Sequence, residues 1–156
     1  MATTGFLLFI SLTLPLFIQV ATATFHAKGS VYCDTCRAGF ETTATFYIQG
    51  ARVAIECKER KSMKVVFYTE GVTDSKGSYH IEVENDHRDH ICQCLLVHSP
   101  LKWCNTPDPG RNRSSIVLTH YQNGVVNHVH HANAMGYLKD KPLIQCHRLL
   151  KYYLSD

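Results

Sequence analysis

Charged side chains are missing from the first 23 residues of this 156-residue chain, so all 16 basic and 13 acidic residues lie downstream. No second apolar run reaches the roughly 20 residues that a membrane-spanning helix needs. The net charge is only +3, which is too small to produce the strong positive field of most nucleic-acid-binding proteins. With 45% hydrophobic residues, the charged part can still bury a core. The composition predicts one small folded domain, with no nucleic-acid partner and no membrane span outside the leader.

The uncharged leader has the pattern of a secretory signal peptide. Its apolar run, Phe6–Val20, is short for a membrane span and is interrupted by Pro15. Ala21 and Ala23 are small residues of the kind that signal peptidase requires, although no Lys or Arg precedes the run. An uncleaved signal anchor is the alternative. We expect residues 1–23 to be a signal peptide and residues 24–156 to be a secreted, extracellular domain.

Recognisable catalytic patterns are also missing. No G-x-S-x-G nucleophile motif occurs. The acidic stretch from Glu82 to Asp89 is interleaved with His87, Arg88 and His90, which is more typical of a solvated loop than of an acid–base pair. We therefore predict no catalytic residues, no enzymatic activity and no cofactor.

Cysteine is abundant where charge is present: all seven cysteines lie after the leader. That density is typical of a disulfide framework in an oxidising compartment, and the odd number leaves one thiol over.

One sequon, Asn112-Arg113-Ser114, follows the turn-forming run Asn105–Gly110. An exposed loop in a secreted protein is a natural glycan acceptor, so we predict an N-glycan on Asn112.

Hydrophobic residues alternate with polar ones through most of the domain, which predicts β-strands. The clearest strands are Arg52–Lys58 and Ser78–Glu84, and a tight turn is expected at Thr73–Gly77. Further strands are expected at 29–33, 64–69, 91–97, 115–121 and 125–130. Only Pro142–Leu154 shows helical spacing, with Asp140 as a candidate N-cap. The prediction is an all-β fold: an antiparallel β-sandwich or partly closed barrel of about seven strands with a short C-terminal helix, stapled by disulfides.

One segment points to a known family. Gly29–Arg37 (GSVYCDTCR), continued by Ala38-Gly39-Phe40, closely resembles the signature of the pollen Ole e I allergen and extensin family. Gly50–Cys57 and Tyr68–Tyr79 are similar to two further family segments, and the remaining cysteines also fall at family positions. The resemblance implies a secreted plant glycoprotein of the pollen or cell wall, without an established enzymatic activity. The proline-rich extension of the extensin-like branch is absent, because the five prolines are scattered.

The resemblance also implies a disulfide pattern, which is Cys33 with Cys104, Cys36 with Cys146, and Cys57 with Cys92. Cys94 is then left as a free thiol. Because Cys94 lies two residues from Cys92, both side chains would point to the same face of a strand. Cys94 is therefore a competitor of Cys92 for Cys57, and we keep Cys92 as the expected partner.

Two other uses of the cysteines deserve comparison. Cys33-Asp34-Thr35-Cys36 is a C-x-x-C motif, but a redox site needs its first cysteine at a helix N-terminus, and the residues that follow favour strands. The same pair with Cys92 and Cys94 has the spacing of a zinc site, yet secretion favours disulfides. Structural disulfides are the preferred interpretation.

The histidines offer a weaker metal hypothesis. His128 and His130 would share one face of a strand, about 7 Å apart, with His120 as a third ligand for Zn²⁺ or Cu²⁺. The simpler interpretation is a polar, solvated strand face, so no metal site is predicted. Trp103, beside Cys104, is expected to pack on the disulfide, and the basic run Lys58–Lys61 to be a solvated hairpin end.

Together these observations predict a non-enzymatic, secreted plant protein that acts as a binding or signalling component. Because some members of the resembled family are implicated in pollen-tube growth as partners of receptor kinases, we expect an extracellular protein partner such as a receptor ectodomain. The alternatives are a polysaccharide-associated cell-wall protein and a metal-binding protein that uses the His128/His130 cluster. The loops Asn85–His90 and Asn105–Arg113 are the expected contact surfaces.

Overall fold

The computed structural model describes residues 24–119, 121–122, 125–126 and 128–154, so the signal-peptide prediction lies outside the described residues. The elements are, in chain order, β1 (Thr24–Asp34), β2 (Phe46–Tyr47), β3 (Arg52–Glu59), β4 (Val65–Val72), β5 (Ser78–Glu84), β6 (His90–His98), β7 (Thr106–Pro107), β8 (Arg113–Ile116), β9 (Tyr121–Gln122), β10 (Val125–Val126), β11 (Val129–His131), β12 (Met135–Leu138) and α1 (Cys146–Leu154). Among these residues, no helix is long and apolar enough to cross a membrane.

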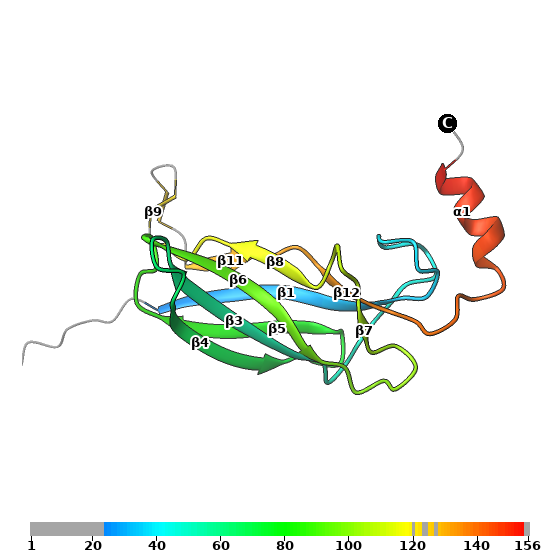
Figure 1. Ribbon diagram of the computed structural model, residues 1–156, viewed down its shortest axis with the longest axis horizontal. Helices are drawn as coiled ribbons and strands as arrows, with labels where there is room; N and C mark the ends of the chain where they lie inside the picture. Colours follow the sequence, from blue (N-terminus) through cyan, green and yellow to red (C-terminus); the bar gives the residue numbers. More distant parts are fainter. Residues whose placement is uncertain (1–23, 120, 123–124, 127, 155–156) are drawn as a thin grey trace, which may run out of the picture.

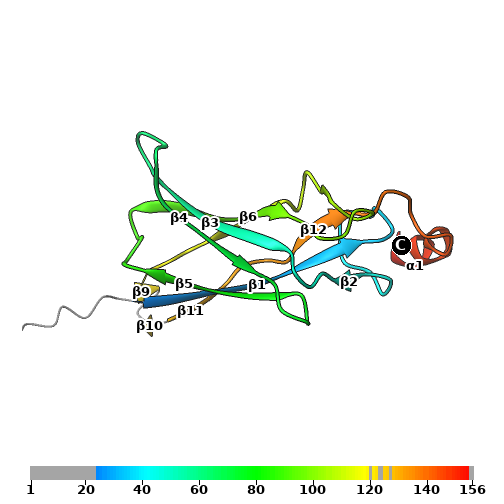
Figure 2. The same ribbon diagram turned by 90° about the horizontal axis from the view of Figure 1, so that it is seen from below.

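Two sheets face each other as an open sandwich, as Figure 2 shows most clearly. One sheet has the strand order β4-β3-β6-β8. The other is built around β1, whose first half pairs with β5 and β11 and whose second half pairs with β2 and β12. The predicted sandwich is thus confirmed, and it does not close into a barrel. The pairings of β1 with β11 and with β12 are parallel, which departs from the purely antiparallel arrangement that we expected.

The alternating sequence accounts for the core. In β5 the side chains of Tyr79, Ile81 and Val83 are buried while the residues between them are exposed, as the alternation predicts. In β3 Val53 and Ile55 are buried as predicted, but Ala54 between them is buried as well, so this strand does not alternate as strictly as β5. These inward faces meet the inward face of β1 in a single hydrophobic cluster between the sheets.

Several predicted boundaries were wrong. The strand expected at 115–121 is β8, which lies at Arg113–Ile116, and the one expected at 125–130 is divided between β10 and β11. The helix begins at Cys146, and Asp140 does not cap it. The reason is that backbone N–H groups before it are already bound elsewhere: Asp140 donates to the carbonyl of Trp103 (2.9 Å) and Leu143 to that of Thr35 (3.1 Å).

Candidate functional site

The C-x-x-C motif lies where β1 ends, in a turn organised by Asp34. This side chain is fully buried, and its carboxylate accepts hydrogen bonds from the backbone N–H groups of Cys36 (3.1 Å) and Gly39 (2.7 Å). The two cysteines bind different partners: Cys33 is bonded to Cys104 and Cys36 to Cys146. In this arrangement the motif links two other parts of the chain and is not a dithiol pair of its own.

These two disulfides gather three segments at one end of the sandwich. We call this region the disulfide end; it comprises residues 35–45, 99–112 and 139–154. Hydrogen bonds add to the disulfides: Arg111 Nε donates to the carbonyl of Gly39 (3.0 Å), and Arg37 Nη1 donates to that of Lys139 (2.8 Å). Figure 1 shows α1 standing beyond the strands at this end. Loops far apart in sequence are thereby held in one fixed surface.

Helix α1 touches the rest of the protein along a narrow edge. Cys146 is its only buried residue. Near the other end of the helix, Tyr153 Oη accepts a hydrogen bond from Thr43 N (3.2 Å), and its ring meets that of Phe40 edge-on at 5.7 Å. The flanks of the helix are left open, and Leu154 is 70% exposed. A short helix with so little packing is held in place chiefly by its disulfide.

Basic side chains dominate the surface of the disulfide end. Its exposed or half-buried basic residues are Arg37, Lys102, Arg111, Lys139, Lys141, His147, Arg148 and Lys151. Its exposed acidic residues are Glu41 and Asp140. This end carries a local positive charge that the small net charge of the whole chain conceals.

Trp103 does not pack as we predicted. Although its neighbour Cys104 is buried, the Trp103 side chain is 42% exposed. One side of its ring contacts Phe46, with ring centroids 5.4 Å apart, and Lys139 Nζ lies 5.4 Å from the ring centroid. The disulfide end therefore presents a partly exposed aromatic ring among its basic groups.

The third disulfide joins the two central strands of the other sheet. The register of β3 and β6 places Cys57 directly opposite Cys92, with Cα atoms 4.0 Å apart, and places Ile55 opposite Cys94. A diagonal neighbour lies about 7–8 Å away across an antiparallel pair, which exceeds the usual Cα separation of a disulfide. The three pairs are those implied by the family resemblance, and the register explains why Cys94 does not compete.

Cys94 is a free, fully buried thiol, and burial raises its pKa. Since only the thiolate reacts, we expect no labelling by a water-soluble disulfide reagent at pH 8 in the native protein. Denaturant without reductant should expose one thiol per chain. Labelling in the native state, or no thiol after denaturation, would show that Cys94 is differently placed or is paired.

The described histidines of the metal hypothesis lie in different environments. The His128 side chain is exposed, whereas His130 is 5% exposed and packs edge-on against Phe25 at 5.4 Å. His120 lies outside the described residues. Among the described residues, the donor atoms that converge are those of Cys57, His87 and Cys92. Because the two cysteines are bonded to each other, their sulfurs are not available as thiolate ligands.

The two loops expected to make contacts lie at opposite ends of β6. Asn85–His90 leads into β6, with His87 buried and its Nδ1 3.0 Å from that of His90. Most of Asn105–Arg113 belongs to the disulfide end, beyond the last residue of β6. Asn112, in this second loop, is partly buried, and its carbonyl accepts a hydrogen bond from Leu96 N (3.1 Å). Its glycosylation stays a prediction.

Comparisons with known proteins agree with this architecture. Residues 23–154 match the family described as "Pollen protein Ole e 1 like". The chain belongs to this family. It is 48% identical over 145 residues to Protein DOWNSTREAM OF FLC of Arabidopsis thaliana, covering 93% of this chain and 88% of that one. It is 46% identical over 129 residues to the pollen-specific protein C13 of Zea mays, covering 83% and 75%.

A solved structure shares the fold. The crystal structure of the major plantain pollen allergen Pla l 1 has a TM-score of 0.69 and 25% sequence identity, covering 78% of this chain and 98% of that chain. The family is of the pollen-allergen type and is not a known enzyme family. The resemblance carried by Gly29–Phe40 is therefore confirmed at the level of family and fold.

Proposed function

We propose that this member of the pollen Ole e 1 family is a secreted, non-enzymatic plant protein that binds an extracellular protein partner, such as a receptor ectodomain, through its disulfide end. The observation that carries the proposal is the convergence of two disulfides on one set of loops. Cys33–Cys104 and Cys36–Cys146 tie three segments, the last of which contains α1, into a single surface. Loops that a rigid scaffold positions are the usual place for recognition.

Pre-organisation is the physical advantage of such an arrangement. A loop that becomes ordered only upon binding loses conformational entropy at that moment, which lowers the affinity. At the disulfide end that ordering has already taken place during folding. The exposed flank of Trp103 and the apolar side chains of α1 supply burial area, and the surrounding basic groups favour an acidic partner surface.

Charge reversal tests the proposal. The triple variant Lys102→Glu, Lys141→Glu, Arg148→Glu alters exposed side chains of the disulfide end and no described hydrogen bond within the protein. We expect its capture of the partner from plant extracellular extract to fall by about tenfold or more, because like charges opposed across an interface are costly.

The matched control places the same charge change at the opposite end of the sandwich. Arg60→Glu, Lys61→Glu, Lys64→Glu alters three exposed residues in and beside the turn between β3 and β4. Capture by this variant should equal that of the wild type. Equal capture by both variants would contradict binding at the disulfide end, and turnover of a substrate by the purified protein would contradict a non-enzymatic role.

A further inference from the structure

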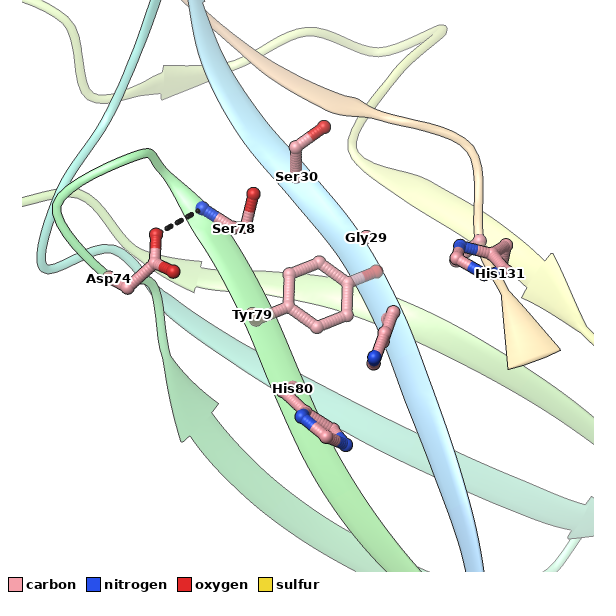
Figure 3. A pocket seen from close by; sticks show the side chains of 9 residues that line it. Gly29, Ser30, Asp74, Ser78, Tyr79, His80 and His131 are labelled. Carbon is pink, nitrogen blue, oxygen red and sulfur yellow. Dashed lines mark hydrogen bonds between the residues drawn. The ribbon is translucent and has the colours of Figure 1, made fainter. Parts of the chain in front are cut away.

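A second polar surface lies on the outer face of the sheet built around β1. The register of β1 with β5 places His80 beside Lys28, and the register of β1 with β11 places His131 on the other side of Lys28. Three side chains that can carry positive charge therefore form a row across three strands. Figure 3 shows His80 and His131 coming from strands on either side of β1.

A hollow of about 470 Å³ lies over this row. Next to the row, Ser30 and Ser78 are paired across β1 and β5 and line the same hollow. Asp74 stands at its edge, held in place because its Oδ1 accepts hydrogen bonds from the backbone N–H groups of Lys76 (2.8 Å) and Ser78 (3.0 Å). The hollow thus has a cationic side and a side of hydroxyl and carboxylate oxygens.

The charge of this surface depends on pH. Lys28 brings an amino group to the row, and imidazole is the side chain whose ordinary titration range lies between pH 5 and pH 8. The ring of His26 stands edge-on to that of His80, with centroids 4.7 Å apart. Partial desolvation, together with the positive charges of Lys28 and His26, lowers the pKa of His80, whereas the neighbouring carboxylate of Glu82 opposes this shift.

The remaining charged groups around the hollow are His131 on β11 and, in the turn before β5, Asp74 and Lys76. The crowding of cationic groups is unfavourable in the free protein when the histidines are protonated. A bound anion would offset the repulsion between these cationic groups. The anion would then favour the protonated histidines. Binding of an anion and uptake of protons are therefore linked in the same direction.

We propose that this hollow binds a carboxylated sugar, such as a uronic acid unit of an acidic glycan, and binds it more tightly in mild acid. Lys28, His80 and His131 hold the carboxylate of the sugar. Ser30, Ser78 and Asp74 hydrogen-bond its hydroxyl groups. The volume is within the range of small-ligand sites, and the combination of donors with a fixed carboxylate acceptor suits a sugar acid better than a bare anion.

Calorimetry with trigalacturonic acid as the probe tests this site in the oxidised protein at low ionic strength. We expect binding about tenfold tighter at pH 5 than at pH 7.5, since histidine changes charge between these values. The fully methyl-esterified trisaccharide and inorganic sulfate should both bind at least tenfold more weakly at pH 5. Binding of the ester or of sulfate as tight as that of the acid would overturn the proposal, as would no binding of the acid at pH 5.

Variants locate the site. Lys28→Met should abolish detectable binding, and the double variant His80→Gln, His131→Gln should remove most of the pH dependence. The controls Lys102→Met and His98→Gln alter an exposed lysine and an exposed histidine away from the hollow, and they should bind as the wild type does. Unchanged binding by Lys28→Met would contradict the assignment.

The hollow and the disulfide end are proposed to bind different ligands, and each can be tested without the other. Lys28→Met should capture the protein partner normally, and the charge reversals of the disulfide end should bind the trisaccharide normally. Either proposal can thus fail without the other.

Discussion

Replacing Gly77 with alanine is expected to lower the free energy of unfolding by about 3 kcal/mol. Gly77 has a φ of 69°, a backbone conformation that residues other than glycine adopt only with strain. A Cβ at this position would also lie 2.4 Å from Tyr47 Cβ and 2.8 Å from the backbone nitrogen of Ile48. The turn could not relieve this clash without moving the segment that leads from β2 to β3. Urea unfolding of the variant gives the measurement.

Gly39→Ala is the matched control. Gly39 has a similar φ of 79°, but a Cβ there would meet no atom within 4 Å. The free energy of unfolding of the alanine variant should therefore fall by only about 1 kcal/mol, which is the cost of placing alanine in a left-handed backbone conformation. Equal losses in the two variants would show that close packing at Gly77 contributes nothing to the stability of the turn.

Removing the Cys36–Cys146 disulfide should have the second large effect, on stability and on binding together. The double variant Cys36→Ala, Cys146→Ala opens a loop with a sequence separation of 110 residues, and we expect a loss of about 2–4 kcal/mol in the free energy of unfolding. Because Cys146 is the only buried residue of α1, the helix should also become sensitive to proteases in the folded protein. Partner capture should fall with it.

Cys57→Ala, Cys92→Ala separates the two effects. This pair also removes a disulfide and lowers stability, but it lies in the central strands of the β3–β6 sheet and leaves the disulfide end linked. We expect this variant to retain capture at temperatures where it is folded. Loss of capture in both variants at equal folded fraction would mean that binding does not depend on the disulfide end.

The sequence predicted those parts of the fold that depend on local pattern. The strict alternation of Ser78–Glu84 specified both a strand and its buried face, and β5 has that face. The turn at Thr73–Gly77 followed from Asp and Gly, and the Gly77 N–H does bind the carbonyl of Asp74 (2.9 Å). The family followed from the Gly29–Phe40 segment.

What the sequence missed depends on contacts between distant segments. The late start of α1 follows from backbone hydrogen bonds that Asp140 and Leu143 make to Trp103 and Thr35. Local propensity carries no information about such partners. The partial exposure of Trp103 likewise depends on distant segments, because the residues that contact its ring are Phe46 and Lys139.

The candidate sites show the same division. The row of His80, Lys28 and His131 exists only because β11 pairs in parallel with β1 in one particular register. A shift of one residue would turn alternate side chains to the other face of the sheet. The histidine pair that the sequence singled out, His128 and His130, is divided between surface and core, so proximity in sequence was a poor guide to a shared site.

Hydrogen–deuterium exchange of the oxidised protein, alone and with its captured partner, tests the central claim most directly. We expect binding to slow exchange in the three segments of the disulfide end, residues 35–45, 99–112 and 139–154. The turn between β3 and β4 and the loop Asn85–His90, at the opposite end, should exchange as in the free protein. Protection confined to those two opposite loops, or to neither end, would contradict the claim.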